Sequence, residues 1–136
     1  MLISSPVVKV SQRAVCGWLL TALLAAVAQA AEAPVGRWVS RLDQLNLQIR
    51  PDGSFVIAMP EGKRPPVKGR WEEEDGIITF RNSPTAPVCG DEPGRYRWER
   101  GASGSVHFEL LNDTCQPRMT HMKHPFDPAP ALEQTE

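Results

Sequence analysis

The chain has 136 residues, of which 41% are hydrophobic and 23% charged, and its formal net charge is −1. This length suits a single small domain. The charge becomes −3 without residues 1–30, where Lys9 and Arg13 are the only charged residues. A slightly acidic chain lacks the basic surface that nucleic-acid binding requires, so that class of function is excluded.

Residues 1–30 are predicted to form a secretory signal peptide. A basic start, from Lys9 and Arg13, precedes the apolar run 17–28, which is too short to span a bilayer comfortably. Ala28-Gln29-Ala30 then fits an A-x-A cleavage site. An uncleaved membrane anchor is the alternative interpretation. We expect a mature protein that is periplasmic or secreted and has no membrane segment.

Short runs of alternating apolar and polar residues follow, as is typical of half-buried strands. The predicted strands, in chain order, are 35–40, 45–49, 55–59, 67–73, 77–81, 94–100, 106–110 and 118–124. A repeated triplet begins or lies within three of them: Gly36-Arg37-Trp38, Gly69-Arg70-Trp71 and Gly94-Arg95-Tyr96. Glycine permits a sharp bend at a barrel rim, and the aromatic residue fills the interior.

These strands predict an all-β fold, a small antiparallel up-and-down β-barrel of about eight strands. The domain is predicted to cover 31–126, and the Pro-rich tail 127–136 is predicted to be disordered. The predicted inner face consists of Trp38, Leu45, Leu47, Ile49, Phe55, Ile57, Met59, Trp71, Ile78, Phe80, Tyr96, Trp98, Val106, Phe108 and Leu110. A barrel of this size is either filled by side chains or holds one small ligand.

Cys89 and Cys115 are predicted to form a disulfide, because export would place them in an oxidising compartment. A hairpin turn at Gly101–Gly104 lies midway between them, so both cysteines would face each other near the open end of that hairpin. A redox or metal role is the alternative. It is disfavoured because the chain has no C-x-x-C spacing.

Two further patterns concern the ends of the barrel. Gly36-x-Trp38 and the basic Arg118 resemble the lipocalin-like, or calycin, β-barrels, and Gly94-x-Tyr96-x-Trp98, Phe108 and Asp113-x-Cys115-x-x-Arg118 are similar to small secreted bacterial domains of that type. The resemblance covers residues 35–126. It implies that Gly36, Trp38 and Arg118 close one barrel end, with Arg118 stacked on the Trp38 ring as a cation–π contact.

A binding site for a small, largely apolar ligand is the predicted function. Concave sites of this kind are mainly apolar and carry a few polar groups, such as a Tyr hydroxyl or an indole N–H. The predicted ligand-binding residues are Trp71, Phe80, Tyr96, Trp98 and Phe108. The alternative interpretation is that these side chains form only the packed core of the barrel.

Copper binding is a second hypothesis, and no other cofactor is expected. Two thioethers and two imidazoles lie within six residues: Met119, His121, Met122 and His124. Soft Met ligands together with His suit copper, especially Cu(I). In a strand, however, alternation would place Met119 and His121 on one face and the other two on the opposite face. Ordinary residues at the end of a strand are therefore the alternative.

Inhibition of a partner enzyme is a third hypothesis. The loop Met59–Pro66 is charged and stiffened by proline, and loops often carry function. Catalysis is not expected, because Ser103 and His107 have no third group placed to orient the histidine. Phosphate-loop and nucleotide-binding fingerprints are also missing from the sequence. We expect a monomer.

Overall fold

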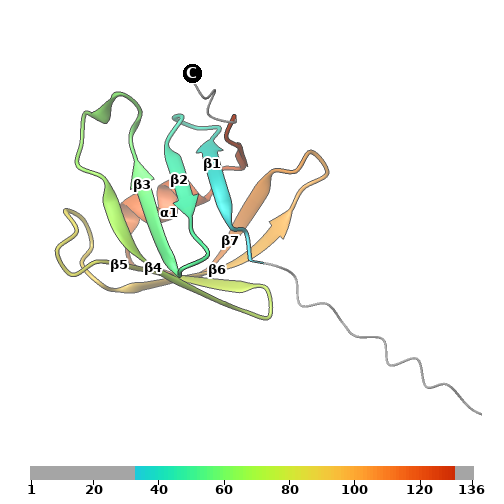
Figure 1. Ribbon diagram of the computed structural model, residues 1–136. Coiled ribbons are helices and arrows are strands. Elements are labelled where there is room, and N and C mark those ends of the chain that lie inside the picture. The colour runs from blue at the N-terminus through green and yellow to red at the C-terminus, as the bar shows by residue number, and fades with distance from the viewer. Residues whose placement is uncertain (1–32, 131–136) are drawn as a thin grey trace, which may run out of the picture.

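A computed structural model describes residues 33–130 and shows a closed antiparallel β-barrel (Figure 1). The predicted signal peptide and residues 131–136 of the predicted tail lie outside the described residues. The strands are β1 Gly36–Ser40, β2 Asn46–Ile49, β3 Ser54–Ala58, β4 Val67–Glu74, β5 Ile77–Asn82, β6 Pro93–Arg100, β7 Val106–Asn112 and β8 Phe126–Pro128. Each strand pairs with its neighbours in sequence, and β8 pairs with β1 to close the ring. The predicted fold class is therefore confirmed.

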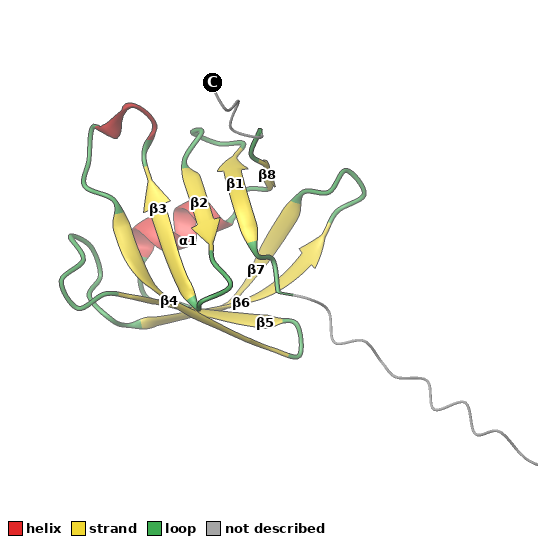
Figure 2. Cartoon of the chain, viewed as in Figure 1, coloured by secondary structure: helices red, strands yellow, loops and turns green. Residues whose placement is uncertain are grey.

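The two ends of the barrel differ in their connections. At the turn end, the hairpin connections 50–53, 75–76 and 101–105 are short. At the loop end, longer segments connect the strands, including 59–66, 83–92 and 113–125. The last of these contains helix α1, Gln116–Met122, which passes behind β2 and β3 in the view of Figure 2. The segment 59–66 contains a single 3₁₀ turn, η1 Pro60–Gly62.

The final strand prediction is wrong in its position. Residues 116–122 form α1, whereas the last strand is β8, which includes two residues assigned to the predicted tail. Asp127 and Pro128 pair with β1, and the Ala129 N–H donates to the Arg37 carbonyl. Pro117 lies in the first turn of α1, where its missing N–H costs no helical hydrogen bond. The barrel domain therefore extends beyond residue 126.

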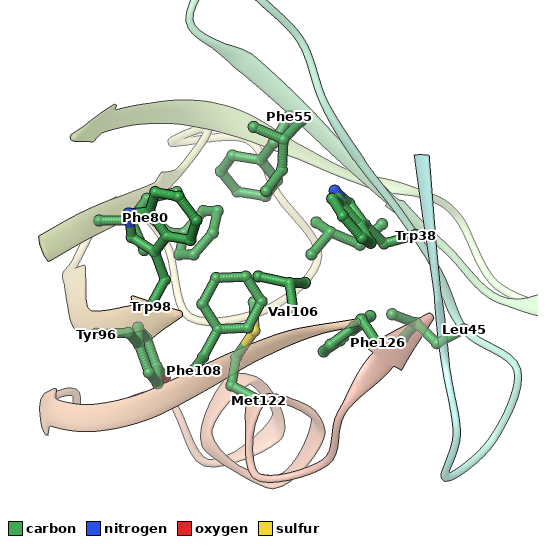
Figure 3. Close-up of a cluster of buried hydrophobic side chains, with 13 residues drawn as sticks. Trp38, Leu45, Phe55, Phe80, Tyr96, Trp98, Val106, Phe108, Met122 and Phe126 are labelled. Carbon is green, nitrogen blue, oxygen red and sulfur yellow. The ribbon is translucent and has the colours of Figure 1, made fainter. Parts of the chain in front are cut away.

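Aromatic side chains fill the middle of the barrel (Figure 3). The rings of Phe55 and Phe80 meet edge-to-face with centroids 5.3 Å apart, and Phe108 contacts Phe80 at 5.9 Å and Phe126 at 5.8 Å. Edge-to-face pairs of this kind add stability beyond the area they bury. Leu110, predicted to lie inside, is instead 44% exposed, and it pairs with Tyr96 beside a register irregularity in the β6–β7 ladder.

Glycine is required in the three triplets for two different reasons. Gly36 has a φ of +146°, which side chains disfavour. Gly69 and Gly94 instead leave room for neighbours. A Cβ at Gly69 would lie 2.6 Å from the Phe55 ring, and one at Gly94 would lie 2.6 Å from Nε of Arg118. The first triplet therefore marks a bend of the backbone, and the other two mark places where a neighbouring side chain packs closely against the glycine.

Within the part of the chain that the structure describes, neither helix has the length and apolar character of a membrane span.

Candidate ligand pocket

An apolar pocket of about 180 Å³ opens at the loop end of the barrel. We call it the loop-end pocket. Its lining comes from the barrel rim, from the loops 59–66 and 83–92, and from α1 and the residues beside it. The lining residues are Leu45, Leu47, Ile57, Met59, Arg64, Pro65, Val67, Asn82, Pro87, Val88, Cys115, Pro117, Arg118, His121, Met122 and Phe126. Only four of these side chains are polar or charged, a composition typical of sites for small organic ligands.

A buried ion pair connects the strands with the segments that line this pocket. Nε of Arg118 donates to Oδ2 of Asp113 at 2.6 Å, and Nη2 donates to Oδ1 at 2.8 Å. The two side chains are 3% and 0% exposed. Arg118 also donates to the Asn82 side chain at 3.0 Å and to the Glu92 carbonyl at 2.9 Å. These contacts connect α1 to β5 and to the loop 83–92.

Asp113 accepts two further hydrogen bonds, from the Tyr96 hydroxyl and from the backbone N–H of Cys115 at 2.9 Å. Burial by itself would raise the pKa of Asp113, but the donors from Arg118, Tyr96 and Cys115 outweigh it and lower that pKa. Burial and the adjacent carboxylate raise the pKa of Tyr96 far above its usual value. Around neutral pH the network therefore holds an ionised Asp113 and a neutral Tyr96.

The predicted disulfide is present between Cys89 and Cys115, with Cα atoms 5.6 Å apart. It joins the loop 83–92 to the residue that precedes α1. The loop-end pocket is lined by Cys115 itself, by Val88, which precedes Cys89, and by Pro117. The disulfide and the Arg118 network therefore fix the same wall of the pocket.

The predicted ligand-binding aromatics do not line the loop-end pocket. Phe80, Tyr96 and Phe108 pack in the core with centroids 5.9–6.4 Å apart. Trp71 is partly buried and donates its indole N–H to the Arg50 carbonyl at 2.8 Å, near the turn end. Trp98 is 7% exposed, and its buried Nε1 has no hydrogen-bond partner among the described residues. Direct ligand contact by these five side chains stays a prediction.

The predicted contact of Arg118 with Trp38 is wrong. The guanidinium of Arg100 lies over the Trp38 ring, 5.4 Å from its centroid, and 6.0 Å from the Trp98 ring. The Trp38 indole donates to the Pro34 carbonyl at 2.9 Å. Arg100 is the last residue of β6, at the turn end of the barrel, whereas Arg118 lies in α1 at the loop end. A cation does cover Trp38, but it comes from a different part of the chain.

Of the four predicted copper ligands, Met119, His121 and Met122 lie in α1 and His124 lies beyond its end, so they do not alternate between two faces as in a strand. Met122 is buried in the core beside Phe108 (Figure 3). Nδ1 of His121 lies 3.0 Å from Oδ2 of Asp43, and Met119 and His124 are partly exposed. Within residues 33–130, no cluster of three or more His, Cys, Asp or Glu side chains could hold a metal ion.

The sequence does not predict this pocket, because most of its lining lies in loops and in a short helix, where no periodic pattern marks a buried side.

Comparison of the chain with protein-family models, with curated proteins and with solved structures finds no match.

Proposed function

We propose that this protein is an exported, lipocalin-like, non-enzymatic binding protein for a small, largely apolar ligand, and that the ligand occupies the loop-end pocket. The observation that carries the proposal is an apolar concavity of about 180 Å³ at one end of an otherwise filled barrel. For comparison, a dry cavity of roughly 150 Å³ accommodates benzene. One aromatic ring, or an alkyl chain of similar volume, would therefore fit.

The polar side chains deep in the pocket support an apolar ligand. Arg118 and Asn82 line it, yet they bond to each other, and Asn82 donates to the Val88 carbonyl at 3.0 Å. Their hydrogen-bonding groups are largely used within the protein.

The affinity expected from apolar contact alone is weak. Burying about 150 Å² of apolar ligand surface would contribute at most roughly 4 kcal/mol, which corresponds to millimolar binding.

A neutral probe, 4-phenyl-1-butanol, tests the proposal by NMR of the methionine methyl groups. Met59 and Met122 line the pocket and Met119 does not, so the chain carries its own internal reference. We expect the probe to shift the Met59 and Met122 signals saturably, while Met119 is unaffected.

A pocket-filling variant supplies the control. Val67→Trp places an indole at the pocket rim, whereas Val56→Trp adds the same bulk to the neighbouring strand, where Val56 does not line the pocket. We expect Val67→Trp to abolish the saturable shifts and Val56→Trp to retain them. Equal shifts of all three methionines in the unmodified protein, or unchanged binding by folded Val67→Trp, would contradict the proposal.

A further inference from the structure

The loop-end pocket continues into a second, more polar hollow. The two share Met59, Arg64 and His121, and the second hollow adds Pro60, Glu61 and Lys63. Arg64 and His121 therefore lie at the boundary between an apolar interior and a charged outer surface. A ligand that filled the pocket would bring its outer end to this boundary.

Some of the charged side chains at this boundary have an ion-pair partner among the described residues, and Arg64 does not. Nζ of Lys63 lies 2.7 Å from Oε2 of Glu61, so these two exposed charges offset each other. Asp43 faces Nδ1 of His121 at 3.0 Å. None of the ion pairs among residues 33–130 involves Arg64. Its guanidinium is thus the cation at the pocket mouth that remains available to an external anion.

His121 lies at the same boundary as Arg64. The buried Nδ1 of His121 has no hydrogen bond of good geometry, although it lies within ion-pair distance of Asp43. Oδ2 of Asp43 therefore lies beside Nδ1 without a directed hydrogen bond.

We infer that the ligand is an amphipathic anion, with an apolar body in the loop-end pocket and a carboxylate or similar group bound at the mouth by Arg64, next to His121. This inference rests on the proposed function. The charges indicate which end of the ligand lies outermost. Arg118, deep in the pocket, is already neutralised by Asp113, whereas Arg64 at the mouth has no such partner among the described residues, so the anionic group is expected at the mouth. The planar guanidinium suits bidentate contact with a carboxylate, which adds to the weak affinity available from apolar contact.

A matched pair of probes tests this inference: 4-phenylbutyrate and 4-phenyl-1-butanol, which share a carbon skeleton and differ in charge. Both are titrated against the protein produced from the full chain, with the Met59 and Met122 methyl signals as the readout. We expect phenylbutyrate to bind at least five-fold more tightly than the alcohol. Arg64→Gln should remove most of that advantage by weakening the binding of phenylbutyrate.

Lys63→Gln is the control variant, because it removes a neighbouring cation that does not line the loop-end pocket. We expect it to change the affinity for either probe by less than two-fold. Equal binding of the two probes, or equal losses in Arg64→Gln and Lys63→Gln, would overturn the anion inference while leaving the apolar pocket intact. If neither probe shifts the Met59 and Met122 signals, both the inference and the proposed function fail.

Discussion

Arg118 and Asp113 form a two-pronged ion pair, with N–O distances of 2.6 and 2.8 Å, at the base of the only helix longer than one turn in residues 33–130. Asp113 is also the acceptor for Tyr96 on β6. One carboxylate therefore connects a core strand, the end of β7 and α1. The stability of the loop-end pocket depends on this buried pair rather than on its apolar lining alone.

Replacing Arg118 should strongly destabilise the protein. Arg118→Leu leaves the Asp113 carboxylate buried without its cation, and breaking a buried pair in this way costs about 3–5 kcal/mol. Arg100→Leu is the matched control, because its guanidinium is exposed and its cation–π contact contributes about 0.5–1 kcal/mol. Urea unfolding measures both. Equal losses would show that Arg118 does not have the role assigned to it.

The same pair predicts acid sensitivity. The folded-state pKa of Asp113 lies below its ordinary value, so its contribution to stability is complete above that ordinary value, near pH 4. The contribution is lost as the pH falls through the lowered folded-state pKa. Urea unfolding of the unmodified protein and of Asp113→Asn, between pH 7 and pH 2, should therefore give a stability difference that shrinks towards the acid end. A difference that stayed constant would argue against an ionised Asp113.

Removing the disulfide should lower the free energy of unfolding by about 3 kcal/mol, because the bridge closes a loop between residues 26 apart in sequence. Cys89→Ser/Cys115→Ser, compared with the parent protein in thermal and urea unfolding, measures this loss. Labelling under denaturing conditions should find both thiols blocked in the parent and free after reduction. Free thiols before reduction would contradict the bridge.

Gly94 should tolerate alanine less well than Gly76. A Cβ at Gly94 would collide with Asp113 and lie 2.6 Å from Nε of Arg118, two groups that the ion pair holds in place. A loss of about 1–3 kcal/mol is expected from such overpacking. Gly76 has open space around it and a φ of +79°, so alanine there meets only backbone strain, about 1 kcal/mol. Urea unfolding of the two variants compares them directly.

The first seven strands were predictable because each one alternates apolar with polar residues. Phe55, Phe80 and Tyr96 point into the barrel at the expected parity, and the hairpin turn at 101–104 placed the two cysteines together. The short helix α1 was not predicted, although Pro117 at its first turn is a helix-start signal. Seven residues are too few for the apolar periodicity that would have outweighed the alternation of Met and His.

The partners of the arginines could not be predicted from local patterns. Arg100 and Arg118 are both basic residues late in the chain, and either one could cover Trp38. The choice depends on which barrel end each residue reaches, and therefore on whether residues 116–122 form a strand or a helix. The loop-end pocket depends on the same segment, which is why the site was less predictable than the fold.

Strand β8 has a consequence for biosynthesis. It supplies the second neighbour of β1, and its Phe126 is completely buried, yet among the eight strands of the barrel it is the last to leave the ribosome. Until then, the first seven strands can form only an open sheet with two unpaired edges and an incomplete core. Open edges of this kind readily pair with other chains. A chain truncated before residue 126 should therefore aggregate rather than yield a smaller barrel, and the nascent protein would depend on protection from self-association until β8 has been synthesised.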